Sequence, residues 1–472
     1  MSDLILTAHT PNTSWLEVDR LKVRDKDMQH VQTASTLTID IGTLLDNSPF
    51  TFVQKWVVAL AAASIIFDGV GVSIIGYAIP KIAHEWGVSG KAFAPVVTAG
   101  LVGMVLGSAY AGIVADKMGR RWAVIGSVFV FALSTAGIGM VRGIHGLAVL
   151  RFLAGAGIGG ALPTSSTFVA EFTPARIRTV AVTCTIVCVP FGGMLAGLMS
   201  AAVLPAYGWR LLFVAGGAIP AVLGIALLIL LPESPRFLAR HSRDWPKLIR
   251  LLTRMGQIVE PKTHFIDETG LRTPSNARIS ALFSAEFMRD TMALWSGLLL
   301  CMFTLYSVNS WLPTVLFSAG FNAVEDSYGL AAFQGGGIAG AVVCSLVITR
   351  LGSKWPMIGC CALCSLMAIA AAEPQVTTHF KLLMAVLTAM GFFGNAVQST
   401  MYGLCAFVYP TAIRARGVAS AVASGRVGAA LAGVAGALVV ASTTRYFLML
   451  SSTMALVLAS LAMVRRHIPA NR

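Results

Sequence analysis

Charged side chains are scarce in this sequence. Only 12% of its 472 residues are Asp, Glu, Lys or Arg, whereas about 25% is usual for a soluble domain. A soluble fold of this length would need a much more highly charged surface. Together with a hydrophobic content of 56%, this scarcity excludes an ordinary soluble protein.

Residue patterns that support enzyme chemistry are also missing. Most of the eight histidines lie in polar segments. No paired carboxylates, His/Cys metal cluster or nucleophile motif occurs in or beside the apolar segments, so we expect neither an enzyme nor a metal site. Residues 1–54 are polar and hold no apolar core followed by a small-residue cleavage site, which argues against a secretory signal.

The chain instead contains apolar segments of about 20 residues, the length that a helix needs to cross a bilayer. Six precede a polar stretch at 232–290 and six follow it. They lie near 56–79, 94–115, 122–140, 147–170, 180–204 and 211–231, then 292–317, 328–348, 357–372, 382–408, 418–441 and 446–464. The pattern predicts an all-α integral membrane protein with twelve transmembrane helices.

The two sets of six segments are related by an internal repeat. A shift of 236 residues places Gly155 on Gly391, Pro174 on Pro410 and Arg178 on Arg414. Two homologous six-helix halves would enclose a cavity that opens to either side of the membrane in turn. The predicted parts are an N-terminal tail (1–54), an N-terminal half (55–231), a central loop (232–290), a C-terminal half (291–465) and a C-terminal tail (466–472).

Cations gather in the loops on one side of the predicted bundle, and few occur in the loops on the other side. Since short cytoplasmic loops are rich in Lys and Arg, both termini and the central loop are predicted to be cytoplasmic. Arg414 belongs to this side and is expected to act in gating and topology. The net charge of +14 follows from this asymmetry and from contact with anionic lipid, so no nucleic-acid partner is expected.

A compact charged motif lies in the tight turn between the second and third segments. It reads Gly112-x-x-x-Asp116-Lys117-x-Gly119-Arg120-Arg121. The glycines permit a sharp turn, and the carboxylate can hold one conformation closed until its ion pair breaks. Gly112, Asp116, Gly119, Arg120 and Arg121 are therefore candidate gating residues.

Two ionisable residues stand deep inside apolar segments. Asp68 lies halfway along the first segment, where a carboxylate is costly unless it is hydrated, paired or protonated. It is a candidate for proton coupling or substrate linkage, the alternative being a buried structural hydrogen bond. Arg426 lies nine residues into the eleventh segment, and its guanidinium can bind a carboxylate with a two-pronged fork. The alternative for Arg426 is a structural ion pair with Asp68 or Glu171.

Further candidates come from the fourth, seventh and tenth segments. Arg151 starts the fourth segment, where snorkelling to the membrane surface is the alternative role. Polar and aromatic residues at spacings of three or four suit a small acid with a flat ring, although they could equally join helices by hydrogen bonds. These residues are Tyr306, Asn309 and Trp311 in the seventh segment and Asn395, Gln398 and Tyr402 in the tenth.

With these motifs, residues 50–465 resemble the major facilitator superfamily, whose signature is the loop motif around Asp116. Glu171-x-x-Pro174-x-x-x-Arg178 and the PESPR run at 232–236 resemble its sugar-porter and organic-ion branches. The runs FDGVGVSIIGYAIP, YSVNSWLP and YPTAIRARGVASAVASGRVG resemble the aromatic acid:proton symporters. One departure is Gly71, which stands where that family has a second acid.

This resemblance implies proton-coupled uptake of a small, aromatic organic acid across a bacterial-type inner membrane. The proton motive force would replace any cofactor, and the partners would be the acid, the proton and membrane lipid, with the chain a monomer. Asp68, Arg151 and Glu171 would serve proton coupling or substrate binding. The alternative is a sugar, polyol or other organic-ion porter of the same superfamily.

Overall fold

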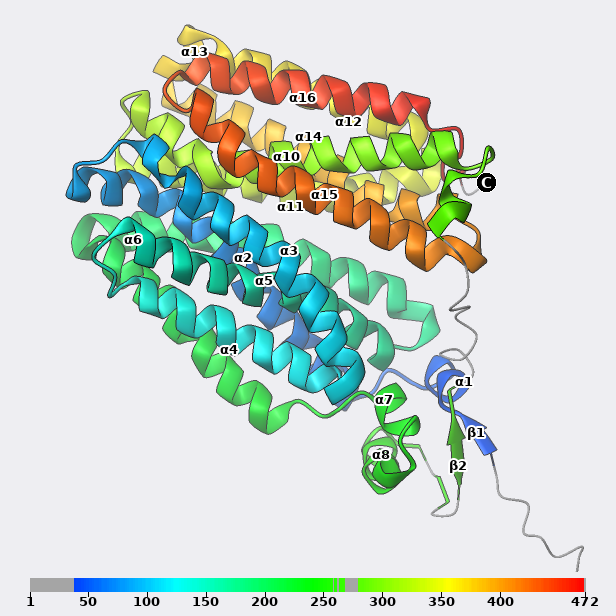
Figure 1. The fold of residues 1–472 in the computed structure, drawn as a ribbon. Helices are drawn as coiled ribbons and strands as arrows, with labels where there is room; N and C mark the ends of the chain where they lie inside the picture. Colours follow the sequence, from blue (N-terminus) through cyan, green and yellow to red (C-terminus); the bar gives the residue numbers. More distant parts are fainter. Residues whose placement is uncertain (1–37, 258, 261–262, 268–278, 471–472) are drawn as a thin grey trace, which may run out of the picture.

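The computed structural model describes residues 38–470 except 258, 261–262 and 268–278. Within these residues, eleven helices are long and apolar enough to cross a membrane. They run side by side and form two bundles, one from each half of the chain (Figure 1). The predicted all-α membrane fold is confirmed.

The N-terminal bundle consists of α2 (Phe52–Trp86), α3 (Ala94–Met118), α4 (Arg120–Ile138), α5 (Ile144–Phe172) and α6 (Ala175–Leu230). The C-terminal bundle consists of α10 (Met288–Ser318), α11 (Ala323–Leu351), α12 (Lys354–Ala372), α14 (Phe380–Val408), α15 (Thr411–Val439) and α16 (Thr443–Met463). Short 3-10 helices η1 (Gly90–Phe93), η2 (Ser242–Asp244) and η3 (Ile279–Phe283) and the five-residue α13 (Pro374–Thr378) lie in the connections.

Helix α6 supplies two of the predicted spans. At about 1.5 Å per residue, its 56 residues would measure about 84 Å if straight, far more than a bilayer. The chain turns at Gly208, whose φ of 76° and ψ of 178° are not helical. A positive φ is easy for glycine because it has no Cβ. The described residues therefore contain twelve spans.

Large apolar side chains cover the outside of the bundle. Leu133, Val222, Ile229 and Leu438 are each more than 60% exposed. Such a surface suits lipid, where apolar side chains need no burial in protein, and it does not suit water. The arrangement is that of a multi-pass membrane protein.

Close helix packing inside each half depends on glycine. A Cβ on Gly107 of α3 would lie 1.9 Å from the carbonyl oxygen of Ala156, and one on Gly155 of α5 would lie 2.0 Å from that of Gly100. The other half repeats this seam between α11 and α14, where a Cβ on Gly391 would lie 1.9 Å from the Phe333 oxygen. Small residues thus let these backbones touch.

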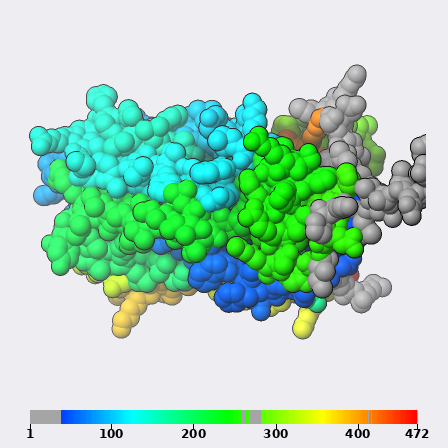
Figure 2. Space-filling view, turned by 90° about the horizontal axis from the view of Figure 1, so that it is seen from below, coloured from blue at the N-terminus to red at the C-terminus, as the bar shows by residue number. Residues whose placement is uncertain are grey.

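A small polar unit projects from one end of the bundle, which we call the domain end. It contains β1 (Thr38–Asp40), α1 (Ile41–Asp46), α7 (Pro235–Ala239), α8 (Trp245–Arg254) and β2 (His264–Ile266). Strands β1 and β2 pair in parallel with Ile39 opposite Phe265, a pairing that the sequence did not predict. Figure 2 shows the green atoms of the central segment at this end, beside the blue N-terminal segment.

The two halves meet at the opposite end, which we call the far end. The main helix pairs that join them are α2 with α10, α3 with α15 and α6 with α11. Close approaches between the halves lie toward the far end of these helices: a Cβ on Gly76 would lie 2.4 Å from the Asn309 carbonyl oxygen, and one on Gly433 would lie 2.6 Å from Thr98 Oγ1. The structure is therefore closed at the far end.

Candidate transport site

Asp68 lies in the interior of α2, with only 3% of its surface exposed. Its backbone neighbourhood is tight, because a Cβ on the adjacent Gly69 would lie 2.1 Å from the Val189 carbonyl oxygen of α6. Its Oδ1 has no hydrogen-bond partner among the described residues. Arg426 of the other half acts on it electrostatically as an opposite charge. The structure thus brings together the two charged residues singled out in the membrane segments.

Arg426 stands among aromatic hydroxyls. Its Nη1 donates a hydrogen bond to the hydroxyl of Tyr306 of α10 at 3.3 Å. Tyr402 of α14 and Asp68 of α2 also interact with it electrostatically. Arg426, Tyr306 and Tyr402 are all half-buried. Four helices from both halves therefore contribute to one cluster with a fork-shaped cation, a carboxylate and two phenol rings, which we call the central cluster.

A polar junction between the halves lies next to this cluster, toward the far end. Asn309 Oδ1 accepts hydrogen bonds from Gln334 Nε2 at 3.0 Å and from Ser73 Oγ at 3.2 Å. Ser73 belongs to the N-terminal half, and the other two residues belong to the C-terminal half. Asn309 was predicted as a ligand, and here it joins the halves. Sequence reasoning missed Ser73, since a serine in an apolar helix carries no signal of its own.

Three other predicted ligands sit in helix seams or beside the central cluster. Trp311 is fully buried and donates from Nε1 to the Ala432 carbonyl oxygen at 3.2 Å, which joins α10 to α15. Asn395 donates to the Gly391 carbonyl oxygen of its own helix at 3.1 Å. Gln398 is half-buried, with Nε2 3.4 Å from Met302 Sδ.

Arg151 points into the protein, not toward the membrane surface. Only 5% of it is exposed, and its two Nη atoms donate to the carbonyl oxygens of Gly71 (2.8 Å) and Val72 (3.0 Å) in α2. A Cβ on Gly71 would lie 2.9 Å from Ile158 Cδ1 of α5. The position where the resembling family has a second acid therefore faces the α2–α5 seam.

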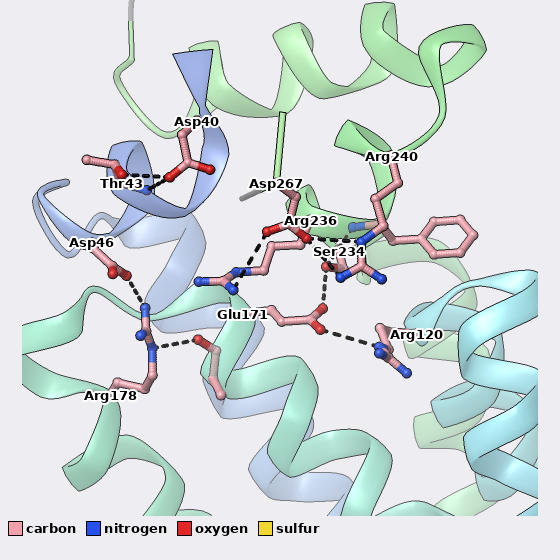
Figure 3. A network of polar contacts seen from close by, with 12 residues as sticks. Asp40, Thr43, Asp46, Arg120, Glu171, Arg178, Ser234, Arg236, Arg240 and Asp267 are labelled. Atoms are coloured by element: carbon pink, nitrogen blue, oxygen red, sulfur yellow. Dashed lines mark hydrogen bonds and ion pairs between the residues drawn. The ribbon is translucent and has the colours of Figure 1, made fainter. Parts of the chain in front are cut away.

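Glu171 lies at the domain end, in a polar network with the gating motif (Figure 3). Its Oε1 pairs with Arg120 Nε at 3.3 Å, and its Oε2 accepts a hydrogen bond from Ser234 Oγ. Arg120 also pairs with Asp116 at 2.8 Å. The structure places Glu171 with Asp116 and Arg120, while Asp68 lies with Arg426 in the central cluster.

The neighbouring Glu233, from the PESPR run, closes the turn between α3 and α4. Its Oε1 accepts hydrogen bonds from the backbone N–H groups of Arg121 (3.0 Å) and Ser234 (2.9 Å). Gly119 has φ 106°, and a Cβ there would lie 2.2 Å from Glu233 Oε2. Gly112, by contrast, has open space where a Cβ would go. Glycine is thus needed at position 119 for both conformation and space.

The same network holds the N-terminal segment in place. Arg178 at the start of α6 pairs with Asp46 of α1 and donates from Nη2 to the Thr173 carbonyl oxygen at 3.1 Å. Asp267, next to β2, accepts from Arg240 at 2.8 Å. In the second half, Arg414 Nε donates to the Tyr409 carbonyl oxygen at 3.2 Å. The Arg178–Asp46 pair fastens α1 to the first half, and the Arg240–Asp267 pair joins the residue after β2 to the end of α7.

A two-halved helical bundle with a charged cluster between its halves is the architecture of a membrane carrier. The Major Facilitator Superfamily description matches residues 61–372 and 294–472, and the chain belongs to this superfamily. Its relatives include the 4-hydroxybenzoate transporter PcaK of Acinetobacter baylyi, which is 30% identical over 88% of this chain and 91% of the relative. The gallate transporter of Pseudomonas putida is 31% identical over 83% of this chain and 86% of the relative.

Solved structures agree on the fold. The inward open conformation of the xylose transporter XylE from E. coli has a TM-score of 0.69, with 18% identity over 88% of this chain and 97% of that one. The predicted superfamily membership and the predicted resemblance to aromatic acid carriers are both confirmed.

Proposed function

We propose that this protein imports a small aromatic acid together with protons, by alternating access of the central cluster to the two sides of the membrane. The observation that carries the proposal is the position of Arg426. Its half-buried guanidinium can bind a carboxylate, it lies beside Tyr306 and Tyr402, and it interacts with Asp68 of the other half. The relatives named for 4-hydroxybenzoate and gallate support an aromatic acid as substrate.

The charges suggest how a proton and an acid could be coupled. While Asp68 is ionised, it competes with a substrate carboxylate for Arg426. Two carboxylates beside one guanidinium in a poorly hydrated site repel each other, so protonation of Asp68 favours binding of the substrate anion. Tyr306 and Tyr402 offer ring faces and hydroxyls to a flat acid. A monoanion that moves with one proton carries no net charge, and each further proton gains about 2.3 kcal/mol per 100 mV.

The domain end is assigned to the cytoplasm, with the chain in a bacterial-type inner membrane. This assignment rests on the cations in the loops and first helical turns at that end, such as Arg120, Arg178 and Lys354. The halves 55–231 and 291–465 would then move against each other, with the present arrangement sealed from the outside. In the opposite state the polar network around Glu171 would lie against the second half.

Uptake into proteoliposomes tests the proposal. We expect labelled 4-hydroxybenzoate to accumulate when the outside is acidic, and a protonophore to abolish accumulation. Arg426→Ala should remove uptake, whereas Arg445→Ala, which removes an exposed arginine at the start of α16, should leave it intact. Accumulation that survives the protonophore would reject proton coupling. Uptake of a neutral sugar that persists in Arg426→Ala would favour a sugar or polyol porter.

A further inference from the structure

A second buried carboxylate lies at the far end, away from the central cluster. Asp326 stands in the first turn of α11 and is only 1% exposed. Ser327 Oγ donates to its Oδ1 at 3.2 Å, but its Oδ2 is buried and has no hydrogen-bond partner among the described residues. An ionised carboxylate buried in this way is costly.

Asp326 lies at the contact between the halves, since Lys81 and Tyr77 of α2 act on it electrostatically. Around it, α11 packs on α6, and a Cβ on Gly197 of α6 would lie 2.7 Å from both Ala331 Cβ and Tyr77 Oη. Tyr77 of α2 donates to the Gly193 carbonyl oxygen at 3.1 Å. Separation of the halves at this end would therefore uncover Asp326 to water.

The charged and titratable groups that face Asp326 are few. Lys81 and Tyr77 act on it from α2, and Glu325 acts on it from its own helix. Glu325 is occupied by the helix cap, where its Oε2 accepts the N–H of Asn322 at 3.0 Å. Helix α6 contributes glycines and backbone carbonyl groups. Lys81 is near enough to attract the carboxylate, yet it forms no ion pair with Asp326 in the described part of the chain.

We propose that Asp326 is a proton-operated latch of the far end, whose protonation favours closure of the two halves. The ionised carboxylate is stable when the halves are apart and water reaches it, and the neutral acid is the form that burial favours. Proton binding and closure are thus linked: closure strengthens as the pH falls and weakens as it rises. The proton returns to the side from which it came, so Asp326 sets the conformational balance and does not carry the transported proton.

This latch rests on the proposed alternating access, but it can be measured without substrate. Spin labels would be placed at Ser89→Cys and Ala319→Cys, exposed positions on either half at the far end, in a full-length protein whose eight native cysteines are replaced. Distance distributions in lipid would then be recorded from about pH 5 to about pH 8. One linked proton changes the ratio of closed to open molecules by up to about tenfold per pH unit.

The expected result is a closed population that grows toward acid pH in the parent protein. Asp326→Asn should stay closed throughout, and Asp326→Glu should keep the pH response. Glu325→Gln, the matched control on the adjacent acid, should also keep it, because glutamine preserves the cap. The latch is rejected if Asp326→Asn responds to pH like the parent, or if the parent does not respond. The latch is also rejected if Asp68→Asn loses the pH response and Asp326→Asn keeps it, because the response would then belong to the central cluster. Failure of aromatic acid uptake would reject the proposed substrate and leave the distance measurement decisive for the latch.

Discussion

Arg426 Nη1 and the hydroxyl of Tyr306 lie 3.3 Å apart, which ties the guanidinium to the neighbouring helix of its own half while it interacts with Asp68 of the other half. A guanidinium held by one phenol keeps its remaining N–H groups for a carboxylate. In this geometry, Tyr306 orients the guanidinium, and the other N–H groups of Arg426 are left to bind the substrate carboxylate.

The first prediction concerns that division of roles. Arg426→Lys should weaken 4-hydroxybenzoate binding by about tenfold to a hundredfold, because a lysine cannot replace the two-pronged contact. Tyr306→Phe should weaken binding only a few fold, since it removes one hydrogen bond of about 1 kcal/mol. Equilibrium binding to purified protein measures both. Equal losses in the two variants would contradict the separation.

The second prediction distinguishes Asp68 from Glu171. Asp68→Asn should abolish proton-driven accumulation yet permit exchange of substrate across the membrane. Glu171→Gln removes an ion pair with Arg120 at the domain end, so it should alter the rate of transport and leave its dependence on the proton gradient unchanged. Uptake and exchange assays in the same vesicles compare them. Loss of proton-driven accumulation in Glu171→Gln, with exchange retained, would return that residue to the coupling step.

The third prediction concerns Gly76, where the two halves touch. An alanine Cβ there would lie 2.4 Å from the Asn309 carbonyl oxygen of the other half. Gly76→Ala should therefore favour the state that is open at the far end. The measurement is the distance between spin labels at positions 89 and 319, which should become longer. Gly126→Ala is the control, because a Cβ at Gly126 meets nothing within 4 Å. An unchanged distance distribution in Gly76→Ala would contradict the prediction, because the interface would then accommodate the added methyl group without opening.

The fourth prediction tests the glycine seam within one half. Gly107→Ala should lower the thermal unfolding midpoint in detergent, because its Cβ would lie 1.9 Å from the Ala156 carbonyl oxygen. Gly126→Ala should be neutral or slightly stabilising, since alanine favours the helix. Thermal unfolding of the two variants beside the parent is the measurement. Equal unfolding midpoints for the two variants would show that the glycine seam does not contribute to stability.

Sequence periodicity predicted the membrane fold well because bilayer thickness imposes one length on every span. The repeat offset of 236 also holds in the structure: α5 begins at Ile144 and α14 at Phe380, while α6 begins at Ala175 and α15 at Thr411. Arg178 and Arg414 bind equivalent carbonyl groups, those of Thr173 and Tyr409. These features are local or set by length, so a sequence can reveal them.

The candidate site was less predictable because it depends on how helices rotate about their axes. Trp311 shares a helix with Tyr306, yet it packs toward Ala432 in a seam. Arg151 could have reached the membrane surface, and it binds backbone carbonyl groups in α2 instead. The strand pair at the domain end was missed since three residues are too few for a periodic pattern. The predicted N-terminal tail lies largely outside the described residues, which begin at Thr38.

That strand pair has a consequence for how the protein is made. Strand β1 precedes the first membrane helix, and its partner β2 follows the last helix of the first half. Because the chain is synthesised from its N-terminus, β1 cannot pair with β2 until the ribosome has delivered all six spans of that half and the residues up to Ile266. Pairing of Thr38–Asp40 with His264–Ile266 thus requires a fully synthesised first half, and it fastens the segment before that half to the segment after it.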